Sequence, residues 1–132
     1  MKKVDSRARY FETNEWARPD GAGYLIGITD FAQTVFGEVT YIELPDIGQS
    51  FQKGTPFAIT ESNKASNEVT MPLSGKITSI NSDLLDHPEW LNDDPYGQGW
   101  LVKIIPADST EWGTLMGAKQ YQNFIGVFFN KQ

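Results

Sequence analysis

Closely spaced turn signals are the feature that most constrains this chain. Glycine and proline recur in turn-like combinations, among them Pro19-Asp20-Gly21, Lys53-Gly54, Ser74-Gly75 and Pro95-Tyr96-Gly97. Such combinations end regular structure, because glycine permits positive φ values and proline fixes φ. Short β-prone runs lie between them, at 24–28, 39–44, 57–60, 69–71, 76–80 and 100–105. The pattern predicts a mainly β, antiparallel fold of short strands, either a sandwich or a flattened barrel.

Two segments interrupt the β pattern with helical features. Thr29 is suited to cap a short helix that Gly37 would end. Near the C-terminus, residues 108–111 resemble a capping box, and apolar residues follow at mostly helical spacing as far as Ile125. We therefore expect one short helix in the N-terminal half and one C-terminal helix. The polar stretch 83–94 is expected to be more loop than helix.

Length and composition favour one domain in the cytoplasm. The chain has 132 residues, of which 39% are hydrophobic, which suffices for one sizeable core but is little for two. We expect a single domain over 1–132. The apolar runs are too short to span a bilayer, and no apolar stretch follows the basic start of the chain, as a signal peptide requires. A cytoplasmic protein with no membrane contact is expected.

Charge and missing residue types exclude several classes of function. A formal net charge of −6 argues against nucleic-acid binding, which depends on clustered Lys and Arg. The chain has no cysteine, so side chains supply neither a disulfide nor a thiolate ligand or nucleophile. The single histidine, His87, has no nucleophile pattern beside it, and the nearby acids lack the spacing of a calcium loop. We expect no metal site and no catalytic activity.

Lys64 is the candidate for chemistry. It lies in a small, polar stretch between the β-prone runs 57–60 and 69–71. This arrangement predicts a hairpin with Lys64 at or beside its tip, where a modifying enzyme can reach the amine. The flanking residues Ser62 and Ala65 are small enough not to obstruct one. Spacing alone does not distinguish Lys64 from an ordinary surface lysine, since lysines are almost always exposed.

Several motifs around Lys64 resemble a known family. Residues 61–65, Glu-Ser-Asn-Lys-Ala, resemble the lipoylation motif of the glycine cleavage H-protein family, and residues 71–75 resemble the Pro-x-Ser-Gly turn that follows it. Further agreement lies in residues 27–33, 37–39, 43–45 and 92–101. The resemblance runs from about Tyr10 to Ile125. Because the motifs occur in the same order with matching separations, the resemblance is specific.

The resemblance implies a fold, a cofactor and partners. It implies a barrel-sandwich hybrid of the biotinyl and lipoyl carrier type, with lipoate amide-linked to Lys64. Glu61, Ser62 and Ala65 would form the neighbourhood that a lipoate ligase or lipoyl transferase recognises. The chain would be a non-catalytic carrier that shuttles an aminomethyl group between the P, T and L proteins of glycine cleavage. A swinging arm does so by raising the effective concentration of its cargo at each partner.

In this family a surface cleft shelters the loaded arm. Matched by motif, Thr13, Glu15 and Glu68 would line that cleft. A carboxylate there can pair with a cationic methylamine. The alternative is that Glu15 and Glu68 are ordinary solvated acids, which are common on protein surfaces.

Three positions depart from the family pattern and keep other functions open. Asn14 stands where His is usual, Asn63 where Val or Ile is usual, and Glu68 where Asp is usual. These departures keep open a second hypothesis, an H-like lipoate-binding protein of a sulfur-oxidising heterodisulfide-reductase-like pathway that carries sulfur intermediates. Biotin carriage is disfavoured because Asn63 and Ala65, rather than methionines, flank Lys64. A plain interaction domain would be identified by a Lys64 that no ligase modifies.

Overall fold

Two antiparallel sheets form the framework of the protein. The computed structural model describes residues 3–130, and side chains as far as Gly126. Within that range, one sheet has six strands in the order β1 (Arg9–Tyr10), β2 (Glu15–Asp20), β3 (Gly23–Ile28), β9 (Val102–Pro106), β8 (Gly75–Ile80) and β5 (Ser50–Phe51). The other has three, in the order β4 (Val39–Glu43), β6 (Pro56–Ser62) and β7 (Ser66–Thr70). The mainly β prediction is confirmed.

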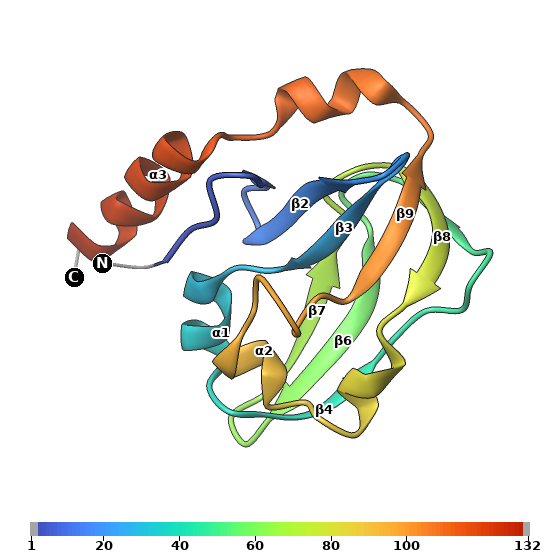
Figure 1. Ribbon diagram of the computed structural model, residues 1–132. Helices are drawn as coiled ribbons and strands as arrows, with labels where there is room; N and C mark the ends of the chain where they lie inside the picture. The colour runs from blue at the N-terminus through green and yellow to red at the C-terminus, as the bar shows by residue number, and fades with distance from the viewer. Residues whose placement is uncertain (1–2, 131–132) are drawn as a thin grey trace.

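Short helical segments surround the sheets in the described part of the chain. They are α1 (Asp30–Phe36), η1 (Ser82–Leu85), α2 (Trp90–Asp93), η2 (Ser109–Thr114) and α3 (Ala118–Asn130). Figure 1 shows α1 and α2 at the end of the molecule where the β6–β7 turn lies, while α3 lies outside the sheets beside the N-terminal segment. The stretch 83–94, which we expected to be mostly loop, therefore contributes to both η1 and α2.

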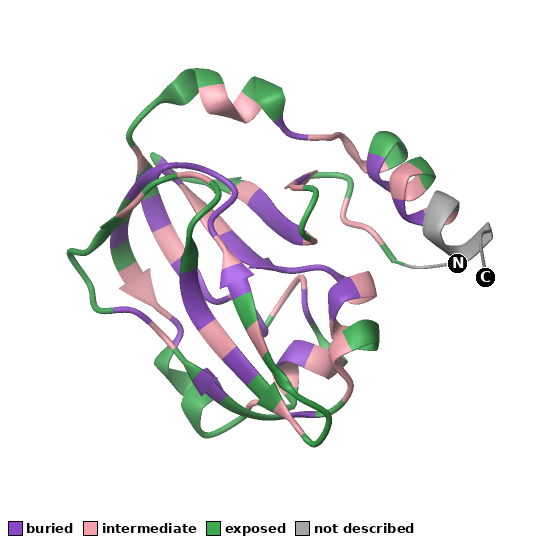
Figure 2. Cartoon of the chain, turned by 180° about the vertical axis from the view of Figure 1, so that it is seen from behind, coloured by how far each residue is buried: buried purple, intermediate pink, exposed green. Residues whose placement is uncertain are grey.

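The main core lies between the sheets and follows from strand alternation. Successive side chains of a strand point to opposite faces, so β9 buries Val102 and Ile104 and leaves Ile105 exposed. Figure 2 shows the resulting alternation of buried and exposed positions along the strands. Fully burying one such aliphatic side chain contributes roughly 1.5–3 kcal/mol. The burial of the inward-facing side chains is therefore the main contribution that holds the two sheets together.

A second, aromatic cluster attaches α3 to the outer strands. The rings of Tyr10 and Tyr121 stack with their centroids 4.5 Å apart, and both residues are fully buried. Trp16 on β2 is also buried, and its Nε1 donates to the carbonyl of Pro95 at 3.1 Å. Ile125 completes the contact from the second half of α3. The cluster joins the two ends of the described chain.

The expected N-terminal-half helix is confirmed, cap included. Thr29 Oγ1 accepts a hydrogen bond from the backbone N–H of Ala32 at 3.1 Å. The helix ends where Gly37 adopts φ 81°, and its N–H donates to the carbonyl of Gln33 at 3.0 Å. The sequence signals for α1 were correct because they act within the helix itself.

The predicted capping box at residues 108–111 is wrong. Asp108 does cap a segment, accepting from the N–H of Thr110 at 2.9 Å, but that segment is the short 3-10 helix η2. Glu111 does not return to the cap, since its carboxylate accepts from both the N–H and the hydroxyl of Ser74. Met116 then pairs with Tyr10 in an isolated β-bridge, which keeps the chain extended before α3. Tertiary contacts thus split the expected C-terminal helix.

Candidate functional site

The β6–β7 hairpin presents Lys64 at its tip. Glu61 faces Ser66 across the hairpin, and the N–H of Ser62 donates to the carbonyl of Ala65 at 3.0 Å. The backbone N–H of Lys64 donates to Ser62 Oγ at 3.2 Å, so a small polar side chain of the motif also holds the turn. The predicted hairpin is confirmed.

The Lys64 side chain is exposed and retains a free amine. No ion pair joins its Nζ to a carboxylate among the described side chains. Amide formation needs an accessible, unpaired amine, so the residue fits covalent attachment of an acyl group. Of the residues that we expect a ligase to recognise, Glu61 and Ala65 are exposed and Ser62 is half-buried. The hairpin therefore brings all of the motif residues together around Lys64.

The stem of Lys64 lies beside Gly37, the residue that ends α1. A methyl group placed on Gly37 would lie 3.5 Å from Cε, 3.6 Å from Cδ and 3.7 Å from Nζ of Lys64. The outer half of the Lys64 side chain therefore covers the face of Gly37 from which the Cβ of any other amino acid would project. The sequence indicated Gly37 as a helix end and as part of a family motif, and it gave no indication of this contact.

A hollow of about 460 Å³ lies between α1 and α2 next to this contact. Its lining is mostly polar and acidic, and it consists of Gln33, Thr34, Gly37, Glu38, Glu89, Asn92 and Asp93. Gly37 belongs both to this lining and to the surroundings of Lys64. The outer part of the Lys64 side chain thus lies at the rim of a polar hollow.

Glu15 is buried rather than open to solvent. It is 2% exposed, and its Oε1 accepts from the hydroxyl of Thr13. Its Oε2 accepts from the backbone N–H of Thr70 on β7 at 2.9 Å. Burial raises the pKa of Glu15 to about 7, although these hydrogen bonds act in the opposite direction. The structure therefore brings Thr13 and Glu15 together, and the solvated-acid alternative does not hold for Glu15.

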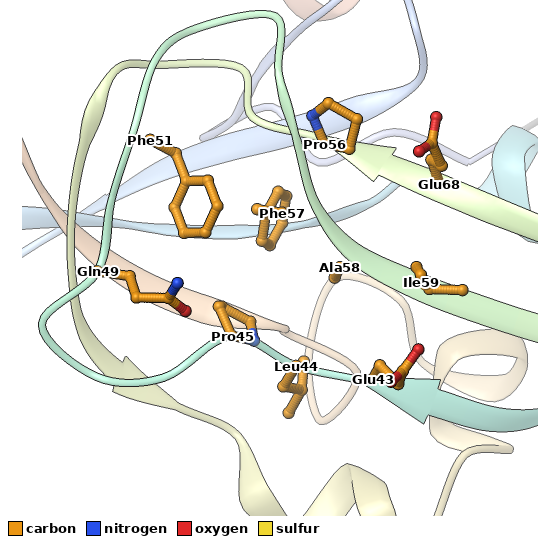
Figure 3. Close-up of a pocket in the computed structure, with 10 residues that line it drawn as sticks. All are labelled: Glu43, Leu44, Pro45, Gln49, Phe51, Pro56, Phe57, Ala58, Ile59 and Glu68. Atoms are coloured by element: carbon orange, nitrogen blue, oxygen red, sulfur yellow. The ribbon is translucent and has the colours of Figure 1, made fainter.

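Glu68 lies on the three-stranded sheet, whereas Glu15 lies on the six-stranded one. It is exposed on β7 and faces Ile59 of β6, which in turn faces Glu43 of β4. Figure 3 shows these residues in a groove of about 290 Å³ that also contains the rings of Phe51 and Phe57. Neither Thr13 nor Glu15 lines that groove. Glu68 is connected to them through its own strand, since the backbone N–H of Thr70, two residues on, donates to Glu15.

Asn14, where the family usually has His, has a local structural role. It is the non-glycine residue with positive φ, 76°, in the described chain. Asparagine tolerates this left-handed conformation better than most residues do. Its Oδ1 accepts from the hydroxyl of Tyr121 at 2.8 Å. The substitution thus fits both a turn and an anchor for α3.

His87 takes part in local packing. Its ring stacks on Trp90 at a centroid distance of 4.5 Å, and its Nδ1 lies 3.2 Å from a carboxylate oxygen of Glu89. Within the described residues, no group of three or more His, Cys, Asp or Glu side chains is arranged to hold a metal ion. Nor does any helix in that range have the length and apolar character needed to cross a membrane.

Comparisons with known proteins agree over nearly the whole chain. A family model described as "Glycine cleavage H-protein" matches residues 8–127. The glycine cleavage system H protein of Anaeromyxobacter sp. (strain K) is 45% identical over 123 residues, which are 93% of this chain and 96% of that protein. The H protein of Herpetosiphon aurantiacus is 44% identical over 131 residues, or 99% of this chain and 100% of that protein.

A solved structure gives the same match in three dimensions. The crystal structure of a glycine cleavage system H protein from Mycobacterium marinum superposes with a TM-score of 0.84. It is 29% identical in sequence, and the match covers 93% of this chain and 99% of that one. Two sheets with the same arrangement therefore persist where most residues differ.

Proposed function

The chain belongs to the glycine cleavage H-protein family, and we propose that Lys64 is the residue on which it carries the lipoyl group. Proteins of this family are carrier subunits that bear lipoate covalently on a lysine and work with the P, T and L proteins of glycine cleavage. The function of this chain is accordingly that of a lipoyl carrier.

The exposed, unpaired amine of Lys64 at the hairpin tip is the observation that carries the proposal. The side-chain amines of two other lysines are engaged. Lys53 Nζ donates to the hydroxyl of Thr114, and Lys103 Nζ forms an ion pair with Asp20. Only Lys64 combines exposure with the Glu-Ser-x-Lys-Ala motif. The lipoyl group, when bound there, supplies a dithiolane that opens to a dithiol. The protein's own part is to hold the attachment point rigidly on a hairpin.

A modifying enzyme must recognise this hairpin. We assign that recognition to Glu61, Ser62 and Ala65, and the enzyme to the lipoate ligases or lipoyl transferases. Glu61 is exposed and faces Tyr41 of the neighbouring strand, so it can pair with a basic group of the enzyme. Ala65 leaves space beside the lysine, and Ser62 holds the turn.

Mass spectrometry tests the attachment. The protein is incubated with lipoate, ATP and a lipoate ligase, and its intact mass is compared with that of Lys64→Arg and of Lys76→Arg. Lys76 is also exposed, on β8, and provides the matched control. We expect one lipoyl addition in the wild type and in Lys76→Arg, and none in Lys64→Arg. An addition that survives in Lys64→Arg, or no addition while the ligase modifies another acceptor, contradicts the proposal.

Thr13, Glu15 and Glu68 are proposed to shelter the loaded arm. The support is that Glu15 already binds Thr13 and the strand that carries Glu68. An approaching cationic amine lowers the pKa of a buried carboxyl, so the carboxyl releases its proton to solvent and the carboxylate pairs with the amine. We expect Glu15→Gln and Glu68→Gln to shorten the hydrolytic lifetime of aminomethyl-loaded protein. An unchanged lifetime in both would remove these residues from the cleft.

Glycine cleavage is favoured over sulfur oxidation as the pathway. The relatives at 44–45% identity are named glycine cleavage system H proteins, and none of them points to a sulfur-oxidising pathway. The departure at Asn14 has a local role in the turn before β2, and Asn63 is an exposed residue of the hairpin turn. The structure attaches no sulfur-specific feature to them.

A further inference from the structure

We propose that Asn92 is a positioning residue for Lys64, acting through the Gly37 turn on which the lysine stem lies. The inference rests on the proposed function of Lys64. Asn92 is 28 residues beyond Lys64 in the sequence, in a motif whose purpose the attachment chemistry does not explain. The structure places it on α2, against the end of α1.

Asn92 uses both ends of its amide on this turn. Its Oδ1 accepts from the backbone N–H of Val39 at 2.9 Å. Its Nδ2 donates to the carbonyl of Gly37 at 2.8 Å and to Gln33 Oε1 at 3.0 Å. The same side chain therefore binds the last turn of α1, the glycine that ends it and the first residue of β4. Three contacts on both sides of Gly37 fix its position relative to both neighbouring elements.

Gly37 transmits that position to the lysine. Its φ of 81° and ψ of −165° lie in a region that is essentially restricted to glycine, so this turn requires glycine at position 37. Cε, Cδ and Nζ of Lys64 all lie within 3.5–3.7 Å of the position that a Cβ on Gly37 would occupy. A displaced Gly37 would remove the surface on which the outer stem rests.

Ordering of the stem matters because lysine is among the side chains with the most rotamer freedom to lose. An acylating enzyme must receive the amine in one orientation. If only a fraction of molecules presents that orientation, the apparent affinity of the enzyme falls in proportion to the fraction. When the lysine already lies along Gly37, a larger fraction of the molecules presents the amine in that orientation. Asn92 is therefore expected to affect the KM of the enzyme for this protein rather than its kcat.

The test is Asn92→Asp, with Asn81→Asp as the matched control. Asp at 92 keeps an oxygen for the Val39 N–H but sets a second oxygen against the Gly37 carbonyl. Asn81 is buried, and its Nδ2 donates to the carbonyls of Gln98 and Trp100, which do not belong to the Gly37 turn. The readouts are the NMR cross-relaxation signal between Gly37 Hα and Lys64 Hε in the unmodified protein, and the kinetics of ligase-dependent lipoylation.

We expect the signal in the wild type and in Asn81→Asp, and its loss in Asn92→Asp. The apparent KM of the ligase for Asn92→Asp should rise about threefold or more with kcat nearly unchanged, as a reduced competent fraction requires. The proposal is overturned if the wild type lacks the signal, if Asn92→Asp retains it, or if both variants raise KM equally. If the ligase modifies no form at Lys64, the proposed function fails, whereas the NMR comparison still decides whether Asn92 positions the lysine.

Discussion

The Glu15 carboxylate on β2 accepts a hydrogen bond from the backbone N–H of Thr70 on β7, with a donor-to-acceptor distance of 2.9 Å. These strands belong to different sheets. In the order β4-β6-β7, β7 is the last strand, so its outer N–H groups have no neighbouring strand in that sheet. The Glu15 side-chain oxygen therefore accepts the hydrogen bond that a backbone carbonyl of a neighbouring strand would otherwise accept. This bond joins the two sheets at a buried point.

The burial of Glu15 makes the stability of the protein depend on pH. The pKa of Glu15 is raised from 4.5 to about 7 in the folded protein, mainly by burial. Between these values the folded state binds the proton more tightly than the unfolded state, so the free energy of unfolding falls as pH rises. The stabilisation that comes from protonated Glu15 is complete below its pKa in the unfolded state and is lost as pH rises through its pKa in the folded state. We expect a loss of about 2–3 kcal/mol between about pH 5 and about pH 8.

Glu15→Gln isolates this effect from other titrations. The amide does not titrate in this range but can still accept from Thr70 and bond to Thr13. Urea unfolding at both pH values should show a smaller decline for the variant than for the wild type. Parallel pH profiles would show that Glu15 titrates normally.

Gly27→Ala should strongly destabilise the protein. Gly27 faces Trp16 across β2 and β3, and a Cβ on it would lie 2.6 Å from two indole carbons. Trp16 is fully buried and bonded to Pro95, so it has no room to withdraw. Overpacking of this kind costs about 1–3 kcal/mol or more. Thermal unfolding should show a clear loss of stability, whereas Gly113→Ala, whose Cβ would meet no described atom within 4 Å, should change little.

Thr60→Val should stabilise the protein by about 1 kcal/mol. Thr60 is 1% exposed, and its hydroxyl has no hydrogen-bond partner among the described residues. A methyl group of the same shape removes an unpaired buried oxygen without leaving a cavity. Thr29→Val is the control, because that buried hydroxyl contacts Tyr121 and caps α1. Chemical denaturation should give opposite signs for the two variants, and a destabilised Thr60→Val would refute the argument.

Tyr121→Phe should cost about 1–2 kcal/mol, because it breaks a bonded chain of buried polar groups. The Tyr121 hydroxyl donates to Asn14 Oδ1 at 2.8 Å and lies 2.7 Å from Thr29 Oγ1. It thereby joins α3 to the first turn of α1 and to the turn before β2. Amide hydrogen exchange at Ala32 should accelerate in the variant. Tyr24→Phe keeps the ring stacked on Trp112 and serves as the comparison, with unaltered exchange at Ala32.

The elements that were predicted correctly depend on neighbours in the sequence. The cap of α1 at Thr29 and the hairpin around Lys64 both follow from residues within a few positions of one another. β2 was missed because its residues, Glu15–Asp20, include charges and a proline and show no regular alternation. Its strand conformation comes from pairing with β1 and β3, which a local pattern does not reveal.

The sequence by itself determined many of the turns, the exposure of Lys64 and the family motif that surrounds it. These properties are local, because turn residues fix their own φ values and a charged side chain in a short polar loop remains in water. The tertiary structure alone decided that Glu15 is buried, that Glu111 leaves its cap for Ser74, and that Asn92 holds the turn beside Lys64. Each of these depends on groups far apart in the chain that meet only when the sheets pack, and packing sets their burial and their partners.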